Sequence, residues 1–146
     1  MNANEKSMPT FPDGETGYLT VRVSTARGAI PLEGASVNIR GNTEELSGII
    51  YSLISDRDGK TPRVALNTPP AKSSAEPEST TPYATYNIDV FKEGYTPVFF
   101  HNVPVFSGIT SVQPAVMIPA GASSVNVDES YISKSSDTSA EKEDIA

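Results

Sequence analysis

Few residues in this sequence have the type and spacing that chemistry requires. The clearest group is Asp56, Asp58 and Gly59, in the stretch SDRDGK. An EF-hand calcium loop begins in a similar way, but it needs further oxygen ligands and a bidentate glutamate about six residues after the glycine. Ala65 stands at that position, and no carboxylate lies near it. The pattern therefore favours a hairpin turn that uses aspartate and glycine for their backbone tolerance, and no metal site is predicted.

His101 is the only histidine and the second group to consider. It is the one residue that a Ser-His-Asp triad could use, but the chain has no G-x-S-x-G elbow and no cysteine nucleophile. A zinc site with one histidine and no cysteine would need three carboxylates, which is unusual. His101 is predicted to be a polar residue on a strand or loop.

Paired carboxylates are the third group, because glycosidases use two of them. Glu44 and Glu45 are adjacent in a polar stretch, and Glu76 and Glu78 lie in a proline-rich one. Nothing in either stretch indicates the burial that raises the pKa of a general acid. There is also no glycine-rich phosphate loop. No catalytic residue, no cofactor and no enzymatic activity are predicted.

Composition restricts the class of protein. The 146 residues carry a formal net charge of −7 and no basic cluster, which argues against nucleic-acid binding. The first 15 residues are polar and lack the apolar centre of a signal peptide, and no apolar run approaches the roughly 18 residues of a membrane span. A cytoplasmic protein without a membrane span is expected.

Alternating apolar and polar residues predict an all-β fold. Pro97, Pro104 and Pro114 are expected on edge strands or at bulges, because proline cannot donate to a sheet ladder. Short strands separated by turns indicate a seven-stranded Greek-key β-sandwich of transthyretin-like or immunoglobulin-like type. The predicted strands lie at 19–23, 35–39, 49–55, 64–66, 86–90, 97–106 and 112–118, and in the last of these Val112, Pro114, Val116 and Ile118 share one face.

The polar ends of the sequence suggest three regions. Residues 1–16 are predicted to be a flexible lead-in, 17–119 the sandwich, and 120–146 an acidic disordered tail that buries too little surface to offset its ordering entropy. Residues 67–82 form a long polar loop with four prolines. Loops of this length in a compact domain are usually functional or disordered.

Aromatic residues concentrate in one third of the chain and provide the candidate binding site. Most of them are expected in the core, but Phe99 and Phe100 are consecutive, so one of the two must point outward if both lie on a strand. Phe100 and Phe91 are predicted to form an exposed apolar patch that binds a ligand. The aromatic residues considered are Tyr83, Tyr86, Phe91, Tyr95, Phe99, Phe100 and Phe106.

Three segments carry a family resemblance. GYLTVRVSTARGAIPLEGASVNIRG, SDRDGKTPRVAL and YNIDVFKEGYTPV together resemble the carboxypeptidase regulatory-like, or transthyretin-like, β-sandwich. Residues 17–119 are more closely similar to the N-terminal domain of clostridial spore cortex-lytic enzymes and related peptidoglycan-binding proteins. The residues that match this second pattern are Pro82, Tyr83, Tyr86, Gly94, Tyr95, Gln113, Met117 and Pro119.

The resemblance implies an accessory module. In those enzymes other domains carry the wall-binding and lytic chemistry, and no such domain is recognisable in these 146 residues, so no lytic activity is expected. The prediction is a non-catalytic module that binds a protein partner in cell-wall or spore-cortex remodelling. The alternative is a module that binds carbohydrate, in particular peptidoglycan. The sequence leaves the partner's identity and the oligomeric state open.

Overall fold

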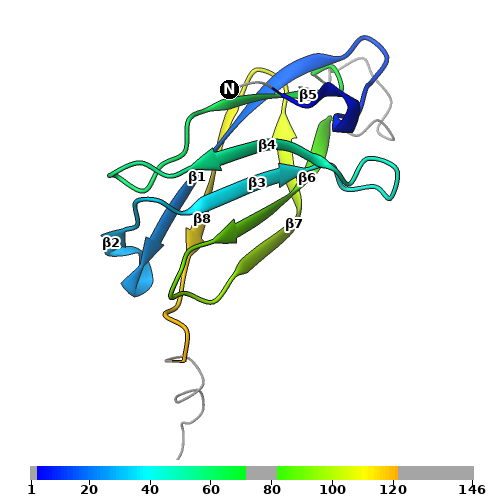
Figure 1. The fold of residues 1–146 in the computed structure, drawn as a ribbon. Coiled ribbons are helices and arrows are strands. Elements are labelled where there is room, and N and C mark those ends of the chain that lie inside the picture. The colour runs from blue at the N-terminus through cyan, green and yellow to red at the C-terminus, as the bar shows by residue number, and fades with distance from the viewer. Residues whose placement is uncertain (1–2, 72–81, 122–146) are drawn as a thin grey trace, which may run out of the picture.

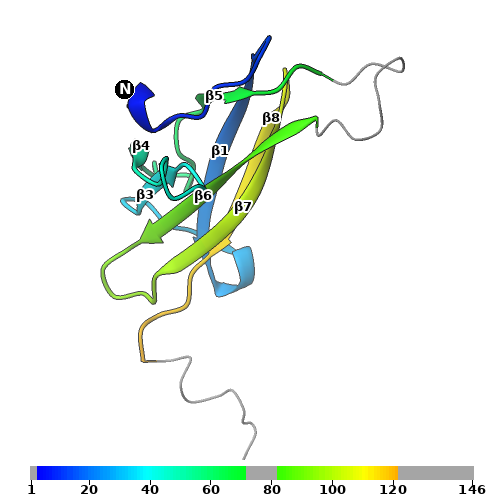
Figure 2. The same ribbon diagram turned by 90° about the vertical axis from the view of Figure 1, so that its right-hand side faces the viewer.

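The chain folds into two packed β-sheets, as Figures 1 and 2 show from two directions. A computed structural model describes residues 3–71 and 82–121, and within these residues there are eight strands and no α-helix. The predicted all-β sandwich is confirmed. The elements are η1 (Glu5–Ser7), β1 (Glu15–Thr25), η2 (Ala26–Gly28), β2 (Ile30–Pro31), β3 (Ser36–Arg40), β4 (Ile49–Ile54), β5 (Val64–Thr68), β6 (Tyr83–Phe91), β7 (Val98–Phe106) and β8 (Thr110–Val116).

One sheet has the order β4-β3-β6-β7 and is antiparallel throughout. The other is built around β1, which pairs in parallel with β8 along one edge and antiparallel with β5 and β2 along the other. The chain therefore passes between the sheets after β2, β4, β5 and β7. The count of eight exceeds the predicted seven because β2 is only two residues long and lies in a stretch that reads as a turn.

The core lies between the two sheets and follows the predicted alternation. On β1, Leu19, Val21 and Val23 are fully buried, and the residues that face them from β3 and β6 are buried as well. Period-two burial is what a strand produces when one of its faces packs on a second sheet. The fully buried partners include Val37, Ile39, Tyr86, Ile88 and Val90.

The last strand presents its apolar alternation to solvent. Val112, Pro114, Val116 and Ile118 do share one face, but it is the exposed one, whereas Ala115 and Met117 point into the core. The register with β1 determines which face is buried. The Met117 N–H donates to the Ser24 carbonyl, and the Thr25 hydroxyl donates to the Met117 carbonyl. The inner face of β8 also carries the polar Ser111 and Gln113, so the apolar alternation falls on the outer face and does not identify the inner one.

Residues 3–14 pack against the sandwich, which differs from the expected flexible lead-in. Met8 is buried and Phe11 contacts the core. The Asn4 N–H donates to the Ile50 carbonyl at 2.9 Å, so this segment also has backbone bonds to the fold. Two isolated apolar side chains in a polar stretch are enough to attach it. The predicted acidic tail and most of the 67–82 loop fall outside the described residues.

The prolines lie where strand chemistry allows them. Pro104 is on β7 and Pro114 on β8, and within the described residues each of these strands has a neighbour along one edge only. Pro97 precedes β7. The prediction of edge positions is confirmed for Pro104 and Pro114, since proline at an edge sacrifices no ladder bond when its nitrogen faces outward.

Two tyrosine hydroxyls connect the sheets. Tyr51 on β4 donates to the Ala65 carbonyl at 2.8 Å, and Tyr86 on β6 donates to the Asn67 carbonyl. Both acceptors lie on β5, in the opposite sheet. Burial raises the pKa of both hydroxyls above the ordinary tyrosine value of 10.0. The neutral, donating form is therefore the one that the folded state favours.

Replacing Tyr86 with phenylalanine is expected to cost about 1–2 kcal/mol at neutral pH, because the Asn67 carbonyl loses its side-chain donor. The pH dependence follows from the raised pKa. The unfolded chain releases the tyrosine proton near pH 10 while the folded chain retains it, so stability falls as the pH rises above that value. Urea unfolding at pH 8 and at pH 11 tests this: the free energy of unfolding should fall less between the two pH values in Tyr86→Phe than in the wild type. An equal fall in both proteins would contradict the stabilising role of the Tyr86 hydroxyl.

Candidate functional site

The D-x-D-G segment is a structural turn. One Asp56 carboxylate oxygen accepts the N–H groups of Asp58 and Lys60 at 2.9 and 3.0 Å. Gly59 has a φ of +80°, in the left-handed region, and its carbonyl accepts the Val23 N–H at 2.7 Å. The turn thereby fastens to β1. A carboxylate engaged by its own backbone in this way has less capacity for a cation.

The turn does not close a β-hairpin, contrary to the prediction. The flanking strands β4 and β5 belong to different sheets, so residues 55–63 carry the chain from one sheet to the other. The Asp56 N–H still donates to the Lys60 carbonyl at 2.8 Å, as in a hairpin end. Local turn chemistry is the same in both arrangements, and only the tertiary pairing distinguishes them.

Replacing Asp56 with alanine is expected to destabilise the fold by about 1–3 kcal/mol, since two backbone donors lose a charged acceptor. Urea unfolding at pH 7 measures this loss. Asp58→Ala is the matched control, because the Asp58 carboxylate accepts no such bond within the described residues, and it should change stability by less than about 0.5 kcal/mol. A midpoint for Asp56→Ala equal to that of the control would contradict the turn's role.

The other titratable candidates do not form a cluster. His101 is exposed on β7, at a bulge where Tyr86 and Ile88 change register against β7. Glu44 and Glu45 are exposed in the β3–β4 loop. Among residues 3–71 and 82–121, no group of three or more histidine, aspartate or glutamate residues is placed to hold a metal ion. Glu76 and Glu78 lie outside these ranges.

The exposed aromatic pair consists of Phe91 and Phe99. Their ring centroids are 5.7 Å apart with an interplanar angle of 78°, an edge-to-face contact, and the two side chains are 38% and 53% exposed. Phe100, the predicted partner of Phe91, instead lies half-buried against the core. The β6–β7 register is the reason: Phe100 is opposite the buried Ile88, and Phe99 is opposite Asp89 on the outer face. The bulge sets that register and is not visible in the alternation.

A third apolar side chain extends this surface across the sheet. Ile54 on β4 is opposite Ser36 on β3, which is opposite Phe91 on β6. Ile54 is 59% exposed, and the small serine lies between the two large apolar groups. We call Ile54, Phe91 and Phe99 the aromatic patch. The sequence-based prediction missed Ile54 and selected Phe100 in place of Phe99. The end-of-strand position of Ile54 in IIYSLIS is the only signal that pointed to it.

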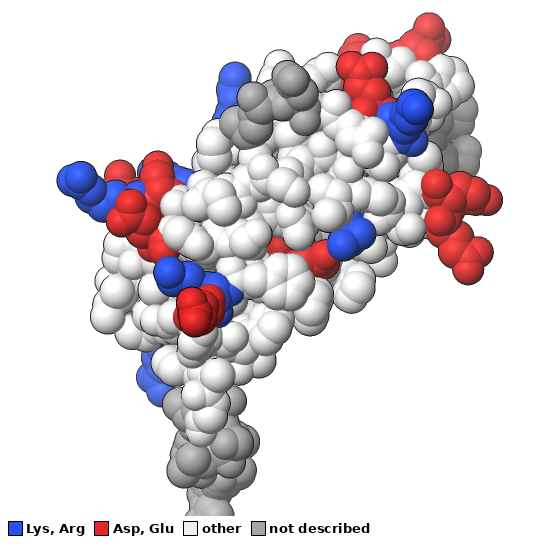
Figure 3. Space-filling model, viewed as in Figure 1, with Lys and Arg blue, Asp and Glu red and all other residues white. Residues whose placement is uncertain are grey.

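Beyond the aromatic patch, the outer face of the β4-β3-β6-β7 sheet is polar and mostly uncharged. Arg40 and Asp89 form an ion pair at 2.6 Å on the same outer face, so their charges offset each other. Asn38 accepts a hydrogen bond from the Ser52 hydroxyl at 3.0 Å. Uncharged side chains cover most of this face in the space-filling view, and charged ones lie mainly toward its edges (Figure 3). An apolar patch with a polar rim is the usual composition of a binding surface.

Several residues of the family resemblance have packing roles. Met117 is fully buried, and Tyr95 packs on the core and bridges to Pro119. The Gln113 amide donates to the Pro114 carbonyl at 2.8 Å. Gly94 has a φ of +87°, which suits the turn between β6 and β7. These positions support the sandwich and do not form a site of their own.

Comparison with known proteins assigns no family to this chain. No family model matches the chain, and no curated protein matches its sequence. Similar solved structures include the TIE protein of Bacillus anthracis, with a TM-score of 0.46 and 13% identity over 72% of this chain and 17% of that one. Chlorocatechol 1,2-dioxygenase from Pseudomonas putida gives a TM-score of 0.47 and 16% identity over 73% and 61%.

A chain from a type II cohesin–X-dockerin complex of Acetivibrio cellulolyticus gives a TM-score of 0.41 and 16% identity over 70% and 58%. This chain therefore spans less than two thirds of each of these structures. Similarities at this level carry no functional argument, because one sandwich architecture supports many unrelated activities. No helix within the described residues is long and apolar enough to cross a membrane.

Proposed function

We propose that this chain is a non-catalytic β-sandwich module that binds a protein partner through the aromatic patch. The observation that supports it is the Phe91–Phe99 pair, exposed on the outer face of the β4-β3-β6-β7 sheet. Aromatic side chains with few rotatable bonds and large apolar area dominate the energy of protein interfaces. A sheet fixes their backbone positions, so little ordering cost is incurred on binding.

The geometry of the two rings favours a protein over a carbohydrate. A sugar ring stacks on a flat aromatic surface, whereas Phe91 and Phe99 meet at 78° and present one face and one edge. Ile54 adds an aliphatic group that offers no stacking plane. Such a surface suits an apolar side chain inserted beside the rings. Binding of peptidoglycan remains the alternative.

The proposed setting is cell-wall or spore-cortex remodelling, and it rests on the sequence resemblance alone. The absence of an enzymatic role is likewise part of the proposal. It is supported by the engagement of Asp56 in its own turn, and no group of three or more histidine, aspartate or glutamate residues within 3–71 and 82–121 is placed to hold a metal ion.

Affinity capture with matched variants tests the proposal. The full chain and the Phe91→Ala/Phe99→Ala variant are immobilised, and extracts of the producing cells are passed over both. Proteins enriched by the wild type and not by the variant are then purified and titrated against each. A saturable complex that requires both rings supports the proposal, and binding that is equal for the two overturns it.

Co-sedimentation with peptidoglycan sacculi tests the alternative in the same preparation. Saturable pelleting of the wild type that survives moderate salt, and that the double variant loses, would assign the aromatic patch to glycan binding instead. Pelleting by neither chain would remove the peptidoglycan alternative.

A further inference from the structure

The outer face of the β1 sheet carries a row of three cations. Arg22 on β1 and Lys60 in the turn are paired across an isolated bridge, so their side chains start from directly opposed positions. Arg63, which follows the turn, places its guanidinium 4.2 Å from the centre of the Tyr18 ring on the same sheet. We call Arg22, Lys60 and Arg63 the cationic row. It is notable in a chain whose formal net charge is −7.

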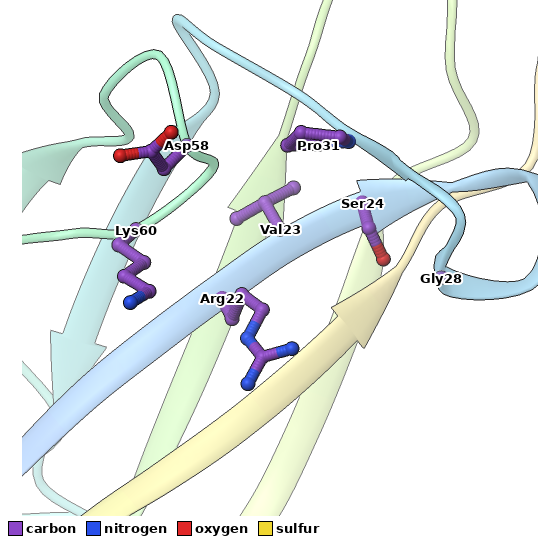
Figure 4. A pocket seen from close by; sticks show the side chains of 7 residues that line it. All are labelled: Arg22, Val23, Ser24, Gly28, Pro31, Asp58 and Lys60. Carbon is purple, nitrogen blue, oxygen red and sulfur yellow. The ribbon is translucent and has the colours of Figure 1, made fainter.

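No carboxylate neutralises these cations within residues 3–71 and 82–121, where the Arg40–Asp89 bridge on the other sheet is the only ion pair. Figure 4 shows the Lys60 and Arg22 side chains at one pocket, and the carboxylate of Asp58, which also lines this pocket, lying away from both charged ends. Like charges opposed on neighbouring strands destabilise a sheet. We therefore expect an anion to bind here and to offset the repulsion between Arg22 and Lys60.

The cationic row lies beside an apolar one. In the β1–β8 register Arg22 is opposite Pro114, with Val112 and Val116 two residues to either side. Val112 and Val116 are both about half exposed. A depression of about 320 Å³ opens at this place, with Arg22, Lys60, Ser24 and Pro31 among its lining residues. The surface therefore suits an occupant that has both carboxylates and apolar side chains.

The chain itself contains such a segment directly after this sheet. Residues 122–146 hold six carboxylates, two lysines and the apolar residues Val125, Val127, Tyr131 and Ile132. Pro114, which is beside Arg22, lies seven residues before Gly121, and Asp128 lies seven residues after it. A chain that reverses at Gly121 can thus return Asp128 and Glu129 to the level of Arg22, since extended residues span about 3.3–3.6 Å each.

We propose that the cationic row is a carboxylate-binding surface and that its occupant is the acidic segment 122–146 of the same chain. The inference is independent of the aromatic patch, which lies on the other sheet. The carboxylates supply the charge that Arg22 and Lys60 lack, and the apolar residues of the segment cover the exposed valines of β8. Because the charges are near the surface, the contact weakens as salt screens it.

Hydrogen exchange measured by mass spectrometry on the full chain tests this. At low salt the amides of residues 122–146 are expected to exchange at least about fivefold more slowly than those of a free peptide of the same sequence. Two or three exposed ion pairs would stabilise the docked segment enough to slow exchange by this factor. The variant Arg22→Glu/Lys60→Glu should lose this protection, as should the wild type in 0.5 M salt. The control variant Lys6→Glu/Lys92→Glu changes the net charge by the same amount at other positions. In this variant residues 122–146 should keep their protection from exchange.

Two results would overturn the inference. Exchange of residues 122–146 at the free-peptide rate in the wild type at low salt would show that the segment does not dock. Protection that increases with protein concentration would assign the surface to a second copy of the chain. Unchanged exchange of the core strands in both variants confirms that each is folded.

Discussion

Loss of both rings of the aromatic patch is expected to weaken partner binding by about 30-fold or more while leaving the fold intact. Alanine replacement of interface aromatics typically costs 2 kcal/mol or more at the centre of an interface, which corresponds to about this factor. Stability should change little, because Phe91 and Phe99 are both substantially exposed and their mutual contact contributes about 0.5–1.5 kcal/mol. Titration of the purified partner and urea unfolding measure the two quantities.

The chain offers a matched control for this variant. Tyr83 and Phe106 form a second aromatic pair at the other end of β6 and β7, with centroids 5.3 Å apart. Their replacement by alanine removes similar apolar surface from the same two strands. It should leave the affinity within about twofold, since the contacts of hot-spot residues are local. A similar loss of affinity in both double variants would show that the aromatic patch is not the binding surface.

Replacing Gly59 with alanine should destabilise the fold by about 3 kcal/mol or more. A β-carbon at this position would lie 2.3 Å from the Val23 carbonyl oxygen, and the φ of +80° adds the roughly 1–2 kcal/mol penalty of the left-handed region. Val23 cannot move away freely, because its N–H and carbonyl bond to Gly59 and Leu32. Against a total stability of about 5–15 kcal/mol, such a loss is large. Urea unfolding at pH 7 measures it.

Gly108→Ala separates the two contributions to that loss. Gly108 has a similar φ of +73°, but a β-carbon there meets nothing within 4 Å. This control should lose only the conformational part, about 1–2 kcal/mol. Equal losses at Gly59 and Gly108 would mean that the turn is not packed against β1 as described.

The strands were predictable because burial on one face imposes a period of two. Leu19, Val21 and Val23 illustrate this, as do Ile88 and Val90, where polar residues separate the apolar ones and only one register is possible. Pro104 and Pro114 also indicated edge strands correctly. Each of these inferences depends on the chemistry of one strand and does not require knowledge of its partners.

The aromatic patch could not be predicted in full because it depends on pairing between strands. The bulge opposite Tyr86 and Ile88 determines that Phe99 faces outward and Phe100 inward, and either orientation satisfies the local sequence. β8 shows the same dependence on pairing, because its regular apolar residues Val112 and Val116 face solvent while Ala115, beside the polar Gln113, faces the core. Register is a property of two strands, so the sequence of one strand does not determine it.

Photocrosslinking from position 99 tests the central claim most directly. A photoreactive phenylalanine analogue replaces Phe99 in the full chain, which is expressed in the producing cells and irradiated. The predicted result is a protein adduct of higher mass that disappears when Phe91→Ala is added, with no such adduct from the same analogue at Ile109, which is 54% exposed in the turn between β7 and β8. No protein adduct from position 99, or equal adducts from both positions, would contradict binding through this patch.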